Sequence, residues 1–210
     1  MNDLIYPWEV QPTSQKWMWH IGYLSTTLPN VTLVMRYVPP EDKQEQIKLL
    51  STYTMGTRNW VVCLCRSPWY MRELYPYVTS TFTFNTSKRS AIMDVQQVLD
   101  AIYSKNEEVL DTFENVDLLV IPCADPDHFG LRTAKSKIAS MLTRRKAKQL
   151  STIVDVLVPE LPSGKQQMMA YVQTLKGVYG DLGWDLFNGE HAKWVSVRVK
   201  GGGGNARAIR

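Results

Sequence analysis

The middle of this chain lacks glycine, with no glycine between Gly56 and Gly130. Loops that bind phosphate need glycine, because only a residue without a Cβ lets consecutive backbone N–H groups wrap closely around a phosphate. The absence therefore counts against a glycine-rich nucleotide loop here. The single Gly-Lys pair, Gly164–Lys165, has no glycine shortly before it and no Ser or Thr directly after it. We interpret it as a turn.

Membrane and export signals are also missing. No run of 18 apolar residues occurs, so we expect no transmembrane helix and no membrane partner. The N-terminus, MNDLIYPWEV, has no basic region followed by an apolar core, which favours a cytoplasmic protein over a secreted one. Cysteine is scarce, and Cys63, Cys65 and Cys123 do not have the spacing of zinc ligands. We expect them to be reduced and buried.

Residues for metal or nucleophilic chemistry are sparse. The three histidines, His20, His128 and His191, are far apart in the sequence. Cys123, Asp125 and Asp127 lie near His128 and could form a small site with it, but Asp-Pro-Asp is more typical of a solvated turn. We therefore predict no metal, no cofactor and no catalytic residue.

Short apolar runs suggest the architecture. Residues 60–65, 117–121 and 152–158 read as strands buried on both faces, and helical segments separate them. This pattern predicts an α/β fold with a mostly parallel sheet flanked by helices. We also expect helices over 41–51, from 95 and from 109, over 131–149 and 166–175, a helical turn at 70–74, and strands over 31–38, 80–85 and 194–200.

The two ends differ from the middle in composition. Residues 1–55 are predicted to form an aromatic arm with a short helix, 56–200 the α/β domain, and 201–210 a flexible basic tail. Tryptophan is enriched at protein interfaces. We therefore propose that the arm docks a partner through Trp8, Trp17 and Trp19, and the alternative is that these rings pack on the protein's own core.

The predicted helix over 131–149 carries many cations and no acidic residue. Such a helix is either a solvated face or a phosphate-binding surface. The candidate contacts with single-stranded DNA are Lys137, Arg144, Arg145 and Lys148, with Trp69 and Tyr70 as possible stacking platforms.

Four segments carry a resemblance to a known family. They are SAIMDVQQVLDAIYSKNEEVLDTFENVDLLVI, RTAKSKIASMLTRRKAKQLSTIV, VYGDLGWDLF and WVSVRVKG, all within residues 90–201. About half the chain thus resembles the ATPase domain of bacterial and phage replicative helicase loaders, which are AAA+ proteins with a P-loop NTPase fold. The resemblance implies partners among replication proteins and a trans-acting role for Arg145.

The chain departs from that family at each catalytic motif. Arg66 and Ser67 follow the 60–65 strand in place of a glycine loop, and Pro122 and Cys123 stand where the resemblance implies metal-binding acids. The sensor positions of the family fall on apolar residues: Val156, Leu157, Leu182 and Leu186. Because phosphoryl transfer depends on neutralising phosphate and metal charge, we expect the nucleotide site to be degenerate and ATP hydrolysis to be lost.

Three hypotheses follow. The first is a non-catalytic AAA+-like adapter in DNA replication that binds a replicative helicase, a loader or an initiator. The second is a single-stranded DNA-binding module. The third is an ATPase that still binds nucleotide in an unusual pocket.

Overall fold

A parallel sheet of five strands forms the centre of the molecule. The computed structural model describes residues 4–9, 38–56, 59–93, 95–122, 132–158, 160, 166, 169–171, 173 and 192–197. The strand order is β2-β3-β4-β1-β5, and every neighbouring pair is parallel. The strands are β1 (Trp60–Cys65), β2 (Ser90–Ile92), β3 (Leu118–Ile121), β4 (Ser151–Leu157) and β5 (Ala192–Val197). The predicted parallel sheet is confirmed.

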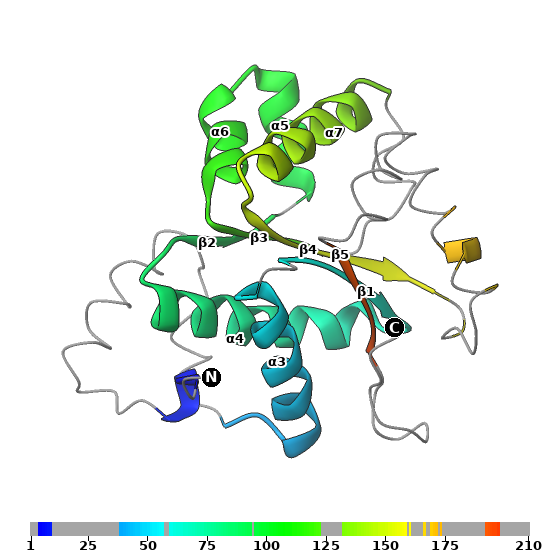
Figure 1. Ribbon diagram of the computed structural model, residues 1–210. Helices are drawn as coiled ribbons and strands as arrows, with labels where there is room; N and C mark the ends of the chain where they lie inside the picture. Colours follow the sequence, from blue (N-terminus) through cyan, green and yellow to red (C-terminus); the bar gives the residue numbers. More distant parts are fainter. Residues whose placement is uncertain are drawn as a thin grey trace.

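Helices cover both faces of this sheet (Figure 1). One face carries α3 (Glu41–Thr54) and α4 (Pro68–Thr86), and the other carries α5 (Val95–Ser104), α6 (Glu107–Asn115) and α7 (Arg132–Ala147). A short 3-10 helix, η1 (Pro7–Glu9), lies near α4. Parallel strands need such crossover helices, because the chain must return to the same end of the sheet before each new strand.

The central strand β1 is buried on both faces, as its continuous apolar run predicts. Trp60, Val62 and Leu64 join the core beneath α5, α6 and α7. The intervening residues of β1 face α3 and α4. None of the six residues is more than 2% exposed. Burying one large apolar side chain stabilises a fold by about 1.5–3 kcal/mol.

The helix α4 corrects two predictions. The expected turn at 70–74 and the expected strand at 80–85 are one helix of 19 residues. Its apolar side chains recur at helical spacing on the core face: Met71, Leu74, Tyr75, Val78 and Phe82. Thr79, Thr81 and Thr86 donate their hydroxyls to the carbonyl oxygens four residues earlier, at 2.7–2.9 Å. These bonds let β-branched residues sit inside a helix, which local propensity disfavours.

The helix α3 belongs to the body of the molecule. Ile47 and Leu50 are fully buried in the same core as Val61 and Cys63 of β1. The predicted strand over 31–38, the glycine-containing turns and the tail over 201–210 lie outside or almost wholly outside the described residues. Among the helices that the structure describes, none is both long and apolar enough to cross a membrane.

Candidate functional site

The carboxyl ends of the strands define the candidate site. All the strands are parallel, so they end at one edge of the sheet. Ligands of open α/β sheets bind outside this edge. Here β1 is followed by Arg66 and Ser67, β3 by Pro122 and β4 by Val158. The connection from β1 to α4 is therefore only two residues long.

The start of α4 has little capacity to bind an anion. A helix N-terminus binds phosphate through its free backbone N–H groups. Pro68, at the first helical position, has no N–H. Ser67 accepts the Tyr70 N–H with its side chain and the Met71 N–H with its carbonyl oxygen, both at 3.3 Å. Pro68 thus removes one backbone N–H from the first turn, and the Ser67 side chain occupies another.

The described residues at the neighbouring strand ends include no group of metal ligands. The backbone N–H of Val158 donates to the Cys65 carbonyl oxygen at 2.8 Å, which keeps β1 and β4 paired at this edge. Among the described residues no cluster of His, Cys, Asp and Glu could hold a metal ion. Cys123, together with the turn containing His128, lies outside the described residues.

Four side chains at this edge face solvent. Trp69 is 70% exposed and Leu157 is 49% exposed, which is unusual for residues of this size. Arg66 and Arg72 are exposed as well. Tyr70, in contrast, is buried between α3 and α4, where its hydroxyl donates to Asp42 Oδ2 at 3.4 Å. The predicted stacking role of Tyr70 is therefore wrong.

A buried polar cluster lies below this edge. Cys63 on β1 pairs in register with Asp155 on β4, and both are fully buried. Burial and the nearby Asp155 carboxylate raise the pKa of the Cys63 thiol and of the Tyr75 phenol. A protonated thiol without solvent access is a poor nucleophile. The expectation that Cys63 and Cys65 are buried is confirmed, and neither forms a disulfide with a described residue.

Comparison with known proteins agrees with the architecture. No family model matches this sequence, and no curated protein matches it. Two solved structures are similar over most of this chain: the DnaC helicase loader and AMPPCP-bound DnaA from Aquifex aeolicus. The TM-scores are 0.58 and 0.56, at 14% and 12% identity. The fold is that of the AAA+ P-loop proteins.

The extent of the match differs between these structures. The match with the helicase loader includes 78% of this chain, and the match with DnaA includes 82%. The match spans 94% of the loader chain but only half of DnaA. A third structure, DnaI, aligns with 94% of this chain and 87% of its own at 13% identity, with a TM-score of 0.46.

Arg145 has a different place in this AAA+ fold from the one predicted. Its side chain is 0% exposed, between α7, α6 and β4. The guanidinium donates five hydrogen bonds of 2.6–3.2 Å, to the carbonyl oxygens of Phe113, Glu114, Val116 and Ser151 and to Thr152 Oγ1. Burial lowers the pKa of Arg145 to about 9, which leaves it charged at neutral pH. The predicted contacts of Arg145 with a partner and with DNA are wrong, because the charge is enclosed.

The other predicted cations of α7 do reach solvent. Lys137 is exposed, and the side chains of Arg144 and Lys148 are 55% and 45% exposed. Glu114 on α6 pairs with Arg144 at 2.6 Å and with Lys148 at 2.9 Å. The helix α7 has no acidic residue of its own, and Glu114 of the neighbouring helix α6 supplies the anion. These two cations are partly neutralised before any phosphate approaches.

The charge state of Glu114 reflects this bridge. Partial burial acts to raise its pKa, but the hydrogen bonds donated by Lys148 and Arg144 outweigh burial and lower the pKa below its ordinary value. Glu114 is therefore ionised at neutral pH. It joins the end of α6 to the last turn of α7.

The N-terminal aromatic residues divide into two groups. Trp8 stacks on Tyr6 with ring centroids 4.9 Å apart and meets Tyr77 of α4 edge-on at 5.9 Å. Asn85 of α4 holds both the N–H and the carbonyl oxygen of Ile5, at 2.9 and 2.8 Å. The alternative that Trp8 packs on the protein's own core is confirmed. Trp17 and Trp19 lie outside the described residues.

Proposed function

We propose that this chain is a non-hydrolysing AAA+-like adapter in DNA replication, which binds a replicative helicase, a helicase loader or an initiator protein. The fold supports the class of protein, since it is similar to that of a helicase loader. The loss of activity is supported mainly by the start of α4, where two residues and a self-capped helix end replace a phosphate-binding loop. A fold without its catalytic groups retains its surfaces, so function is expected to reside in binding.

The proposal predicts a complex that does not need nucleotide. The purified chain would be mixed with candidate replicative helicases, loaders and initiators and analysed by size-exclusion chromatography with light scattering. A complex is expected without nucleotide, and this chain is expected to contribute no Mg·ATP dependence to it, because it is not expected to bind Mg·ATP. We expect one copy at the end of a partner assembly, because the chain offers no nucleotide site to a further subunit. Self-assembly into ATP-dependent rings, or binding to none of these proteins, would overturn the proposal.

The variants for that experiment need care. Arg145→Ala and deletion of residues 1–20 are unsuitable, because both remove groups that hold the fold together. Loss of binding in either variant would report unfolding as readily as a lost contact. Substitutions of exposed residues are therefore preferable.

A single-stranded DNA contact along α7 is a second candidate, favoured by the exposure of Lys137, Arg144 and Lys148. Each single-strand phosphate contact adds about 0.7 to the slope of log affinity against log salt. Replacing all three cations with alanine is expected to flatten that slope by about 2, measured with fluorescent oligo(dT) by anisotropy. Unchanged binding would show that these three cations form a solvated surface and do not contact DNA.

A further inference from the structure

An unusual group of side chains surrounds the start of α4. We call it the Trp69 surface, and it consists of Arg66, Trp69, Arg72 and Leu157. Trp69 is the most exposed large apolar side chain among the described residues, at 70%. Within the described part of the chain, neither arginine takes part in an ion pair. An exposed indole beside two unpaired cations has no evident role in stabilising the fold.

The backbone places these residues at the same edge of the sheet. Trp69 and Arg72 are three positions apart on α4, so they share one face of the helix. Arg66 directly follows β1 at the same edge. Leu157 is opposite Cys65 in the register of β1 and β4. It continues the row of β4 residues through Ile153 on the side of the sheet that α4 covers.

We propose that the Trp69 surface docks an acidic protein segment that carries an apolar side chain. The apolar side chain covers the indole and Leu157, while carboxylates of the segment pair with Arg66 and Arg72. Tryptophan and arginine are the residues most enriched at the energetic centres of protein interfaces. This inference rests on the proposed adapter function, because it identifies the surface through which a partner protein binds.

Among the described residues, no acidic side chain forms an ion pair with either arginine of this surface. Glu73 pairs with Lys43, and Asp42 accepts the hydroxyl of Tyr70. A nucleic acid strand would also meet arginine and stack on tryptophan. An acidic protein segment fits better, because Leu157 adds exposed apolar area that phosphates and sugars leave uncovered.

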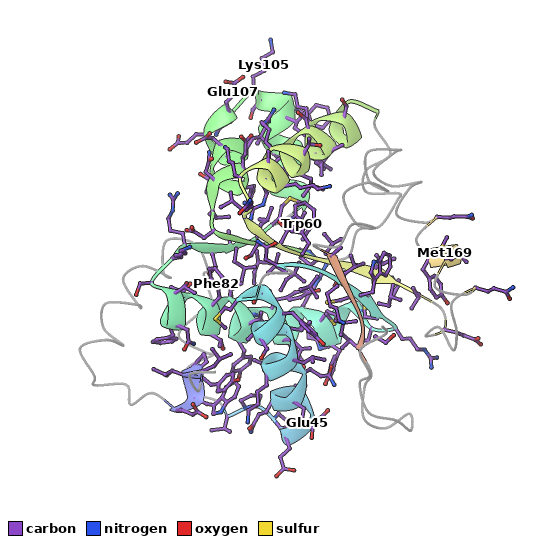
Figure 2. All side chains as sticks on the ribbon, viewed as in Figure 1. Glu45, Trp60, Phe82, Lys105, Glu107 and Met169 are labelled. Atoms are coloured by element: carbon purple, nitrogen blue, oxygen red, sulfur yellow. The ribbon has the colours of Figure 1, made fainter. Side chains whose placement is uncertain are left out.

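The test uses the full chain and defined probes. A fluorescent synthetic peptide that alternates glutamate with leucine and phenylalanine is titrated and followed by anisotropy, beside the same peptide with glutamine for glutamate and beside fluorescent oligo(dT). The variants are Trp69→Ala and the double variant Arg66→Gln, Arg72→Gln. The matched control is Tyr103→Ala with Lys105→Ala: Tyr103, on the last turn of α5, is 64% exposed, and the cation Lys105 directly follows α5. Figure 2 shows Lys105 far from α4.

The acidic peptide is expected to bind, to weaken with salt and to lose about tenfold or more in affinity with either Trp69-surface variant. The glutamine peptide is expected to bind the Trp69-surface variants no differently from wild type. The control variant is expected to bind the acidic peptide as tightly as wild type does. Binding of oligo(dT) that depends on Trp69, without binding of the acidic peptide, would overturn the proposal and assign the surface to a nucleic acid strand. Absence of any binding that depends on Trp69 would also overturn it.

The same variants separate this inference from the proposed function. If a replicative helicase, loader or initiator binds the wild type and the Trp69→Ala variant equally, the adapter function stands and the Trp69 surface is wrong. If the acidic peptide binds through Trp69 but none of those proteins does, the surface stands and the proposed class of partner is wrong.

Discussion

Arg145 is charged in sequence and internal in the structure, and this contrast decides what the residue can do. A guanidinium has five N–H donors and no acceptor. Four carbonyl oxygens and one hydroxyl surround it here, drawn from α6, the chain before β3 and the start of β4. It therefore joins the end of α7 and the start of β4 to the segment between α6 and β3, about 30 residues earlier.

Replacing Arg145 with alanine is expected to lower the free energy of unfolding by about 3–5 kcal/mol, because buried carbonyl oxygens lose their donor and a cavity remains. Urea unfolding measures the effect. Arg144→Ala is the control, since this neighbouring arginine lies in an exposed ion pair and should cost less than about 1 kcal/mol. Equal stability of the two variants would show that the internal hydrogen bonds of Arg145 do not stabilise the fold.

Helical spacing separates these two adjacent arginines. Position 145 is seven residues after Ile138 and four after Met141, on the apolar side of the helix, whereas Arg144 lies to one side of it. The sequence does not show what would pair with a buried guanidinium there, because three of the four carbonyl oxygens that bind Arg145 come from residues about 30 positions earlier. Burial of a single polar residue depends on such tertiary partners, whereas the core positions of β1 could be predicted from their continuous apolar run.

At the scale of elements, α4 shows how an alternating pattern can mislead. Thr81, Phe82, Thr83 and Phe84 alternate like a strand, and β-branched residues favour strands. The longer apolar spacing from Met71 to Phe82 is helical and determines the structure. A window of six residues was too short to contain it.

The N-terminal segment is expected to stabilise α4. Trp8→Ala should lower the free energy of unfolding by about 1–2 kcal/mol, because it removes the ring that packs on Tyr6 and Tyr77. Trp69→Ala is the control, and it should change stability by less than about 0.5 kcal/mol because its ring is exposed. If Trp8→Ala left both urea and thermal unfolding unchanged, the segment would not be part of the folded body.

The bridge between α6 and α7 should depend on pH. The folded pKa of Glu114 is lowered, so its contribution is present above the ordinary carboxylate pKa and is lost as pH falls through the folded value. Wild type is therefore expected to exceed Glu114→Gln by less than about 1 kcal/mol at neutral pH. The difference should vanish at the acidic end of a urea titration series. A difference that is constant with pH would rule out an ionised Glu114 as its source.

For the whole molecule, the strand–helix alternation was enough to predict a parallel α/β sheet, and the structure has the fold of AAA+ P-loop proteins. Sequence reasoning also noted the missing glycine loop. It did not predict how the gap is closed, with Pro68 at the first helical position and Ser67 accepting two of the remaining N–H groups. Those contacts depend on the exact start of α4 at Pro68, whereas the sequence analysis predicts a helical turn only from residue 70.

We propose above all that this protein binds its partner without binding a nucleotide itself. Isothermal titration of Mg·ATP into the full chain tests it most directly. We expect no heat of binding above dilution at protein concentrations that would detect micromolar affinity, because the loop before α4 has no glycine, Pro68 removes a backbone N–H from the first turn and the Ser67 side chain occupies another. Saturable binding with a micromolar Kd would contradict the account.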